Sequence, residues 1–229
     1  MTRTPLNVAV FASGGGTNFQ ALLDHQRRQR LWRIVLLVMN REAGAAGRAE
    51  AAGVPVHIIP TRGREPDDLA SETLAVLDEH DVDVVALAGY LRRIPASVVG
   101  RYRGRILNIH PALLPDFGGA GMYGMSVHRA VVESDAEVSG ATVHFVDEKY
   151  DEGAILGQWR VGRLPDDTPD ALAARVLRVE HALYPRAVDH LCAALAKGEV
   201  PTRMEDVWLD EPQTTVRSTE LPPSETEQA

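Results

Sequence analysis

The sequence has little of what marks secreted, membrane-embedded or nucleic-acid-binding proteins. Its one cysteine, Cys192, excludes an intramolecular disulfide and fits a reducing compartment. No apolar run approaches the ~18 residues of a membrane span, and the N-terminus lacks the apolar core of a signal peptide. Basic residues are outnumbered by 32 acidic to 24, a net charge of −8, which disfavours nucleic acid as a partner. These absences favour a cytoplasmic protein with no membrane or nucleic-acid partner.

The composition is that of an ordinary globular protein. Of the 229 residues, 45% are apolar and 24% are charged. We expect a single domain over residues 1–210. Residues 211–229 are rich in proline, serine, threonine and glutamate, which predicts a disordered tail.

The first half of the chain alternates apolar runs with amphipathic stretches. The apolar runs predict strands at 7–12, 33–39, 56–59, 82–88 and 106–109. The amphipathic stretches predict helices at 17–28, 45–52 and 67–79. Apolar strands alternating with helices are typical of an α/β fold with a mostly parallel sheet and helices on both faces.

The second half has a different pattern. Residues 116–124 contain four glycines and predict a mobile loop, and residues 127–134 predict a helix. Residues 139–146 and 154–161 alternate like strands of a sheet edge or hairpin. A long helical pattern covers 169–196, with Pro185 expected to kink or interrupt it.

A glycine-rich turn, Ser13-Gly-Gly-Gly-Thr-Asn18, joins the first predicted strand to the first predicted helix. Backbone N–H groups in such a turn, together with the helix N-terminus, form an anion site. A dinucleotide site would need a third glycine where Phe19 stands and an acid where Asn40 stands, and no lysine marks a P-loop. The pattern favours a sugar phosphate, and a tight turn without a ligand is the alternative.

Candidate catalytic residues follow the fifth predicted strand. Asn108 and His110 are two residues apart, so both project to one face at the strand's carboxyl end. Asp151 follows a later strand and could reach His110, raising the pKa of the imidazole and keeping it charged. An amide, an imidazole and a carboxylate suit attack of an amine on a carbonyl. The alternative is a structural pair that fixes the loop stiffened by Pro111.

Other catalytic arrangements do not fit. Ser13 is not in a Gly-x-Ser-x-Gly elbow, and Cys192 lies among apolar neighbours typical of a core. The histidines show no ligand spacing, so we predict no metal. Direct transfer from an activated donor is then the simplest mechanism.

Several segments in order resemble the glycinamide ribonucleotide transformylase family, folate-dependent formyltransferases of purine synthesis. They are FASGGGTN at 11–18, LAGYLRRI at 87–94, LNIHPALLP at 107–115, GATVHFVDEKYDEG at 140–153 and EHALYP at 180–185. The resemblance covers roughly residues 7 to 200 and implies a Rossmann-like formyltransferase fold.

The resemblance also implies roles for individual residues. The phosphate of glycinamide ribonucleotide would bind at Gly16, Thr17 and Asn18, and Glu180 would lie near its amine. Asn108, His110 and Asp151 would be catalytic, with His110 the general acid. The co-substrate 10-formyltetrahydrofolate would contact the residues Arg64, Leu91, Arg92, Arg93, Ile94 and Asn108.

Other readings remain open. The stretch 116–127 is longer than in short family members and could form a lid. Methionyl-tRNA formyltransferase and formyltetrahydrofolate deformylase, a hydrolase, share the fold, but the first is expected to carry a basic second domain and the second an N-terminal regulatory domain. A non-catalytic sugar-phosphate-binding module would not need the Asn–His–Asp set, and an oxidoreductase fits the glycine turn poorly. The oligomeric state is open, with a homodimer among the options.

Overall fold

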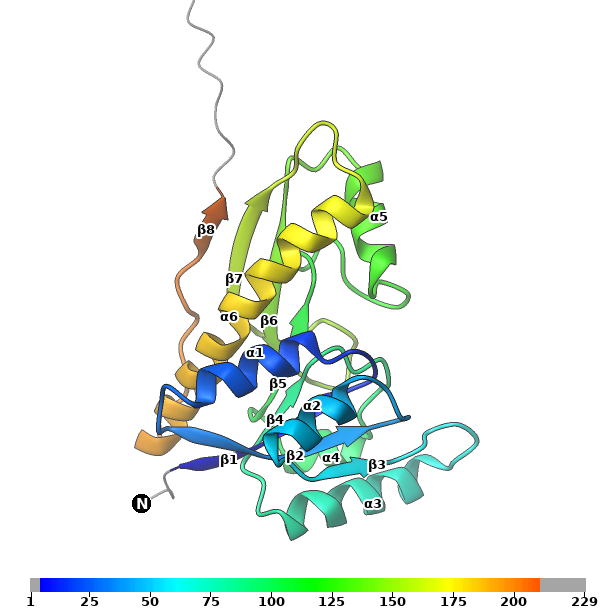
Figure 1. Ribbon diagram of the computed structural model, residues 1–229, viewed down its shortest axis with the longest axis vertical. Coiled ribbons are helices and arrows are strands. Elements are labelled where there is room, and N and C mark those ends of the chain that lie inside the picture. The colour runs from blue at the N-terminus through cyan, green and yellow to red at the C-terminus, as the bar shows by residue number, and fades with distance from the viewer. Residues whose placement is uncertain (1–4, 211–229) are drawn as a thin grey trace, which may run out of the picture.

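One sheet of eight strands organises the part of the chain that the structure describes. The structure is a computed structural model and describes residues 5–210 (Figure 1). The tail predicted at 211–229 lies outside this range. The strands are β1 Leu6–Ala12, β2 Trp32–Met39, β3 Val56–Ile58, β4 Val84–Leu87, β5 Ile106–His110, β6 Val138–Phe145, β7 Ile155–Gly162 and β8 Val207–Asp210.

The order of the strands is β3-β2-β1-β4-β5-β6-β7-β8. The first five pair in parallel, β6 pairs antiparallel with both β5 and β7, and β8 is parallel to β7. The mostly parallel α/β sheet predicted from the sequence is confirmed. The chain reverses its direction of travel across the sheet between β1 and β4, where ligands bind in open α/β sheets.

Helices connect the strands and cover both faces of the sheet. They are α1 Thr17–Gln26, α2 Ala45–Ala52, α3 Pro66–Glu79, α4 Ala96–Arg101, α5 Met125–Glu133 and α6 Pro169–Lys197. Among residues 5–210, no helix combines the length and apolar character needed to cross a membrane.

Alternation along β1 creates two separate cores. Val8 and Val10 pack with the apolar sides of α1, α2 and α6, whereas Ala9 and Phe11 pack with those of α3 and α4. Successive side chains of a strand point to opposite faces, so an entirely apolar strand requires a cover on each face. Cys192 is buried in the first core, as predicted.

The differences from the predicted elements have local causes. α4 is only six residues long and β8 only four, so neither shows enough periods of a pattern to be recognised. Of the expected kink or interruption at Pro185, the interruption is wrong, because α6, 29 residues long in all, runs through Pro185 unbroken. The pair β6 and β7 forms the predicted hairpin, but β8 covers its outer edge.

A buried tyrosine fastens α6 to the centre of the sheet. The hydroxyl of Tyr184 lies 3.0 Å from the carbonyl oxygen of Leu87 and 3.1 Å from that of Leu107. These carbonyls belong to β4 and to the adjacent β5. The single hydroxyl proton is shared between these two carbonyls, so its removal takes a donor away from buried acceptors, which is unfavourable away from water.

We predict that Tyr184→Phe lowers the free energy of unfolding by about 1–2 kcal/mol, the cost of leaving a buried acceptor without its donor. Urea denaturation followed by circular dichroism measures the change. Tyr150→Phe is the control, because the Tyr150 side chain is exposed. Equal stability of the two variants would contradict a fastening role for the Tyr184 hydroxyl.

Candidate active site

Three strand ends bring the candidate residues to one edge of the sheet. β1 leads into the glycine-rich turn, β4 into the segment 88–94, and β5 ends at Asn108 and His110. These parallel strands are neighbours in the order β1-β4-β5, so their carboxyl ends lie side by side. Ser13 links the first two segments: its N–H donates to the Gly89 carbonyl, and its hydroxyl accepts from the Leu91 N–H at 2.9 Å. The Ser13 hydroxyl thus joins two loops.

A cleft of about 530 Å³ opens at this edge. Its walls include Thr17, Asn18, Leu91, Asn108, His110, Asp151 and Glu180. The backbone of residues 119–124 forms another wall. The structure therefore brings the glycine turn and the Asn–His–Asp set into one space, which spacing in the sequence could only suggest.

The glycine turn can hold an anion without help from a side-chain cap. Gly16 stands before α1 in the left-handed conformation, with φ 71°, and no side chain caps the first turn of the helix. The first N–H groups of a helix have no partner within the helix, so these donors can serve a ligand. A Cβ on Gly16 would lie 2.7 Å from the Cβ of Ala45 and 3.0 Å from its Cα, so glycine is required here.

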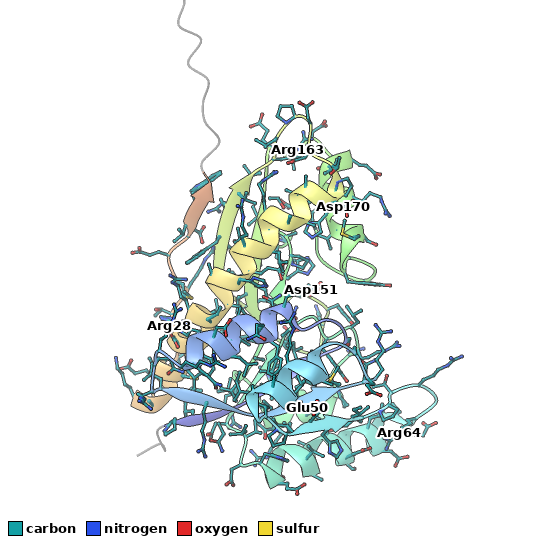
Figure 2. All side chains as sticks on the ribbon, viewed as in Figure 1. Arg28, Glu50, Arg64, Asp151, Arg163 and Asp170 are labelled. Carbon is teal, nitrogen blue, oxygen red and sulfur yellow. The ribbon has the colours of Figure 1, made fainter. Side chains whose placement is uncertain are left out.

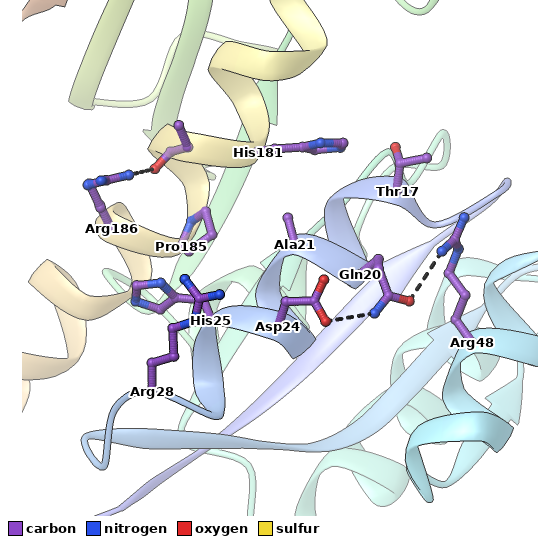
Figure 3. Close-up of a pocket in the computed structure, with 11 residues that line it drawn as sticks. Thr17, Gln20, Ala21, Asp24, His25, Arg28, Arg48, His181, Pro185 and Arg186 are labelled. Atoms are coloured by element: carbon purple, nitrogen blue, oxygen red, sulfur yellow. Dashed lines mark hydrogen bonds between the residues drawn. The ribbon is translucent and has the colours of Figure 1, made fainter.

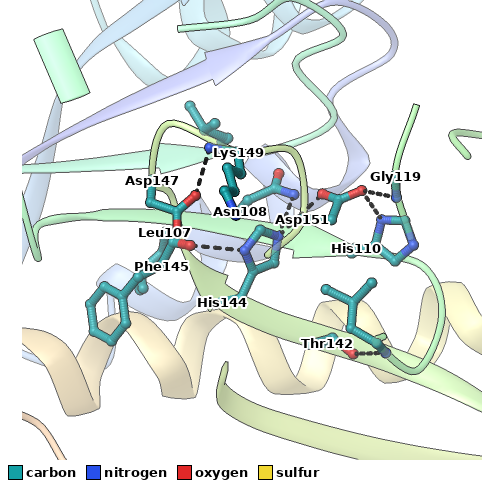
Figure 4. A network of polar contacts seen from close by, with 12 residues as sticks. Leu107, Asn108, His110, Gly119, Thr142, His144, Phe145, Asp147, Lys149 and Asp151 are labelled. Carbon is teal, nitrogen blue, oxygen red and sulfur yellow. Dashed lines mark hydrogen bonds and ion pairs between the residues drawn. The ribbon is translucent and has the colours of Figure 1, made fainter. Parts of the chain in front are cut away.

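Polar contacts join Asn108, His110 and Asp151 through a second histidine (Figure 4). Nδ1 of His110 lies 3.7 Å from Oδ2 of Asp151, and Nε2 of His144 lies 3.5 Å from Oδ1. Nδ2 of Asn108 is 3.0 Å from Nε2 of His144. The side chains of His110 and Asp151 are 4% and 9% exposed, so little water screens this pair.

Backbone groups of the glycine-rich loop complete the network. Nε2 of His110 is 2.7 Å from the carbonyl oxygen of Phe117, and the N–H of Gly119 donates to Oδ2 of Asp151 at 3.0 Å. A carbonyl oxygen can only accept, so Nε2 carries a proton and Nδ1 faces Asp151. One loop thus fixes the tautomer of the imidazole and the orientation of the carboxylate.

The expected direction of the His110 pKa is wrong. Burial lowers the pKa of His110 below its ordinary value, and the opposing effect of Asp151, which raises it, does not compensate. Burial alone would raise the pKa of Asp151, but the His144 ring, the Gly119 N–H and His110 together lower it. The pair is therefore a neutral imidazole beside an ionised carboxylate at neutral pH.

Glu180 is a buried acid on the opposite wall. Burial raises its pKa to about 7, although the hydrogen bond from Nδ2 of Asn18 to Oε2, at 2.6 Å, opposes the shift. Oδ1 of Asn18 is buried without a hydrogen-bond partner among the described residues. The cleft thus has in its wall a carboxyl whose pKa is about 7.

The residues proposed as a folate wall divide between two places. Arg92, Arg93 and Ile94 line a small pocket of about 60 Å³ with Asn108 and the turn 146–151, next to the cleft. The guanidinium of Arg93 donates to the Glu148 carbonyl of that turn. Arg64 is not brought to either space: it pairs with Glu72 of α3, beyond β3 and away from Asp151 (Figure 2).

Sequence reasoning missed several members of the site. His144 is paired with Asn108 in the β5–β6 register, a relation that appears only once strand pairing is known. His128 of α5 also lines the cleft, and its Nδ1 is buried without a partner among the described residues. Phe117 and Gly119 contact the site through backbone atoms, so the identity of their side chains gives no indication in the sequence that they belong to it.

The formyl transferase family profile matches residues 6–188. The chain belongs to the formyl transferase family. This match confirms the formyltransferase membership that the sequence motifs implied.

Among relatives of this formyl transferase is the chloroplast phosphoribosylglycinamide formyltransferase of Arabidopsis thaliana, 49% identical over 81% of this chain and 65% of that protein. The Escherichia coli phosphoribosylglycinamide formyltransferase is 34% identical over 90% of this chain and 94% of that protein. The crystal structure of the Brucella melitensis phosphoribosylglycinamide formyltransferase matches with a TM-score of 0.76 at 38% identity, over 84% of this chain and 97% of that one.

We predict that His110 of this formyl transferase titrates below the ordinary histidine pKa, and that Asp151→Asn lowers its pKa further by removing a charge that favours the imidazolium. An NMR pH titration of the His110 ring measures both. Glu152→Gln is the matched control, because it removes the neighbouring charge from an exposed side chain paired with Lys149. A higher His110 pKa in Asp151→Asn would refute the assigned interaction.

Proposed function

We propose that this protein transfers the formyl group of 10-formyltetrahydrofolate to the amine of glycinamide ribonucleotide, a step of purine synthesis. The observation that carries the proposal is the shared cleft, in which an anion-binding turn and the Asn–His–Asp set face one space. The relatives named phosphoribosylglycinamide formyltransferase support the same assignment. Because the chain spans only 65% of the Arabidopsis protein, the activity is proposed from the site as well.

The phosphorylated substrate would enter with its phosphate at the glycine turn. Backbone N–H groups at Gly16, Thr17 and Asn18 would hold the phosphate. Its amine would then lie near Glu180, which lines the cleft and is held by the hydrogen bond from Nδ2 of Asn18.

The folate would lie beside Arg92, Arg93 and Ile94, with Leu91 in the adjoining cleft. Asn108 lines both spaces, so a formyl group placed there would meet the attacking amine. Arg64 would contact the folate tail only after leaving Glu72.

Attack of the amine nitrogen on the formyl carbon moves the carbonyl electron pair onto oxygen. Nδ2–H of Asn108 and Nε2–H of His110 would donate to this oxyanion, with Nε2–H changing its partner from the Phe117 carbonyl to the substrate. Nδ1 of His110, neutral and facing Asp151, would take the amine proton directly or through water. The imidazolium, stabilised by Asp151, then returns a proton to the folate nitrogen as the carbon–nitrogen bond breaks.

We propose that no metal takes part in this mechanism. The composition predicts a cytoplasmic location.

We predict that purified protein formylates glycinamide ribonucleotide with 10-formyltetrahydrofolate as the only co-substrate, followed by the absorbance change of the folate. His110→Ala and Asp151→Asn should each lose at least ~100-fold in turnover, the usual scale for a positioned proton-transfer group. Glu152→Gln should retain the wild-type rate, since its side chain is exposed. Near-normal turnover in either site variant would remove that residue from the mechanism.

A second test concerns the phosphate. We predict that Gly16→Ala raises the Michaelis constant for glycinamide ribonucleotide about tenfold or more, because a non-glycine residue in this conformation is strained by ~1–3 kcal/mol and the Cβ meets Ala45. Gly47→Ala on α2 is the control, because a Cβ there meets no atom within 4 Å. An unchanged Michaelis constant in Gly16→Ala would place the phosphate elsewhere.

A further inference from the structure

A second hollow lies on the other side of α1, outside the cleft. It has a volume of about 510 Å³ and runs between α1 and α6, with α2 contributing one residue (Figure 3). This size is within the range of ~300–1,000 Å³ typical of small-molecule sites. Thr17 belongs to the walls of both the hollow and the cleft, and the catalytic set belongs only to the cleft.

Three arginines line the hollow without a carboxylate partner among the described residues: Arg28, Arg48 and Arg186. Arg48 donates to the Gly15 carbonyl at 2.8 Å and to the Gln20 side chain at 3.2 Å. Nη1 of Arg186 donates to the Ala182 carbonyl at 2.6 Å. The guanidinium of Arg186 also lies over the Trp159 ring, 5.2 Å from its centroid, a contact that leaves its charge without a counter-ion.

The acids nearest the hollow do not neutralise it. Asp24 is the one carboxylate among its lining residues, and it accepts a hydrogen bond from Gln20 at 3.0 Å. Asp189, behind His25, is shared between the His25 ring at 2.6 Å and the indole N–H of Trp32 at 2.7 Å. The walls therefore keep a positive excess.

His181 adds an unfilled polar position. Its Nε2 is buried and has no hydrogen-bond partner among the described residues. Burial, and then the positive charge of Arg48, lower the pKa of the His181 ring. An anion in the hollow would offset the positive charge that Arg48 places there.

The length of the hollow separates it from the phosphate position at the glycine turn. Arg28 lies eleven residues after Thr17, just beyond the C-terminal end of α1. At the helical rise of ~1.5 Å per residue, the two positions are roughly 16 Å apart along the helix axis. A single phosphate at the turn cannot contact arginines at both ends. Guanidinium groups match phosphate oxygens in geometry and bind them in pairs of hydrogen bonds.

We propose that this hollow between α1 and α6 binds an anion bearing several phosphate groups, at a site distinct from the substrate phosphate. Its terminal phosphates lie between Arg28 and Arg186, and its other end approaches Arg48 and His181. Free oligophosphates and nucleoside polyphosphates share this chemistry. The site is independent of the formyl-transfer assignment, since it uses none of the Asn–His–Asp set.

The test is isothermal titration calorimetry of the full chain at fixed ionic strength, with tripolyphosphate, ATP and inorganic phosphate as separate probes. We expect one saturable site for tripolyphosphate or ATP, and much weaker binding of inorganic phosphate. Tighter binding of ATP identifies a nucleoside polyphosphate, and equal binding identifies an oligophosphate; both outcomes support the site.

Variants locate the binding. Arg28→Ala and Arg186→Ala remove exposed side chains and should each weaken binding about tenfold, the scale of a charged hydrogen bond. Arg27→Ala is the matched control, because Arg27 is exposed, adjacent in sequence and outside the hollow's lining. It should bind as the wild type does.

Three results would overturn the proposal. One is the absence of saturable binding by both tripolyphosphate and ATP. Another is an equal loss in Arg27→Ala, which indicates non-specific attraction. The third is binding that resists Arg28→Ala and Arg186→Ala but is displaced by glycinamide ribonucleotide, which puts the anion at the glycine turn. None of these depends on formyl transfer, so a failure here and a failure of the proposed activity are distinguishable.

Discussion

The carboxylate of Asp151 is the group on which the geometry of the cleft depends. It is almost fully buried, and an ionised carboxylate in such a place requires partners. The Gly119 N–H, in the loop after β5, donates a hydrogen bond to it. Nδ1 of His110 on β5 and Nε2 of His144 on β6 lie 3.7 and 3.5 Å from its oxygens. Asp151 itself has φ 54°, a conformation that is unfavourable for a residue with a side chain and persists only where contacts enforce it.

One consequence is that the glycine-rich loop, besides lining the cleft, positions the catalytic side chains. Its Phe117 carbonyl holds the proton on Nε2 of His110, and its Gly119 N–H holds the carboxylate that Nδ1 faces. Because burial keeps the imidazole neutral, Nδ1 has a lone pair to offer, and the nearby carboxylate stabilises the charge once a proton arrives. A His110 that was already charged could not act as the first base.

The same network shows how far the sequence can lead. Continuous apolar runs alternating with amphipathic stretches predicted the parallel α/β core, and the two-residue spacing placed Asn108 and His110 on one face. The pairing of His144 with Asn108 depends on strand register, and the contributions of Phe117 and Gly119 come from the backbone. Burial decides that the pKa of His110 is lowered and not raised, and a sequence motif does not show how deeply a side chain is buried. Arg64, assigned by resemblance alone, instead pairs with Glu72.

The boundary between cleft and hollow is a contact between α1 and α6 rather than a wall of apolar residues. Asn18 and Glu180 form a buried hydrogen bond on the cleft side. Their sequence neighbours face the hollow: Thr17, which precedes Asn18, lines both spaces, and His181, which follows Glu180, lines the hollow. With a pKa of about 7, Glu180 is divided between its charged and neutral forms near neutral pH. The charged form accepts from Asn18 and attracts an ammonium, whereas the neutral form can donate. Since an amine attacks only when it is unprotonated, an acid poised between these forms can accept the proton of an arriving ammonium group before the carbonyl is reached.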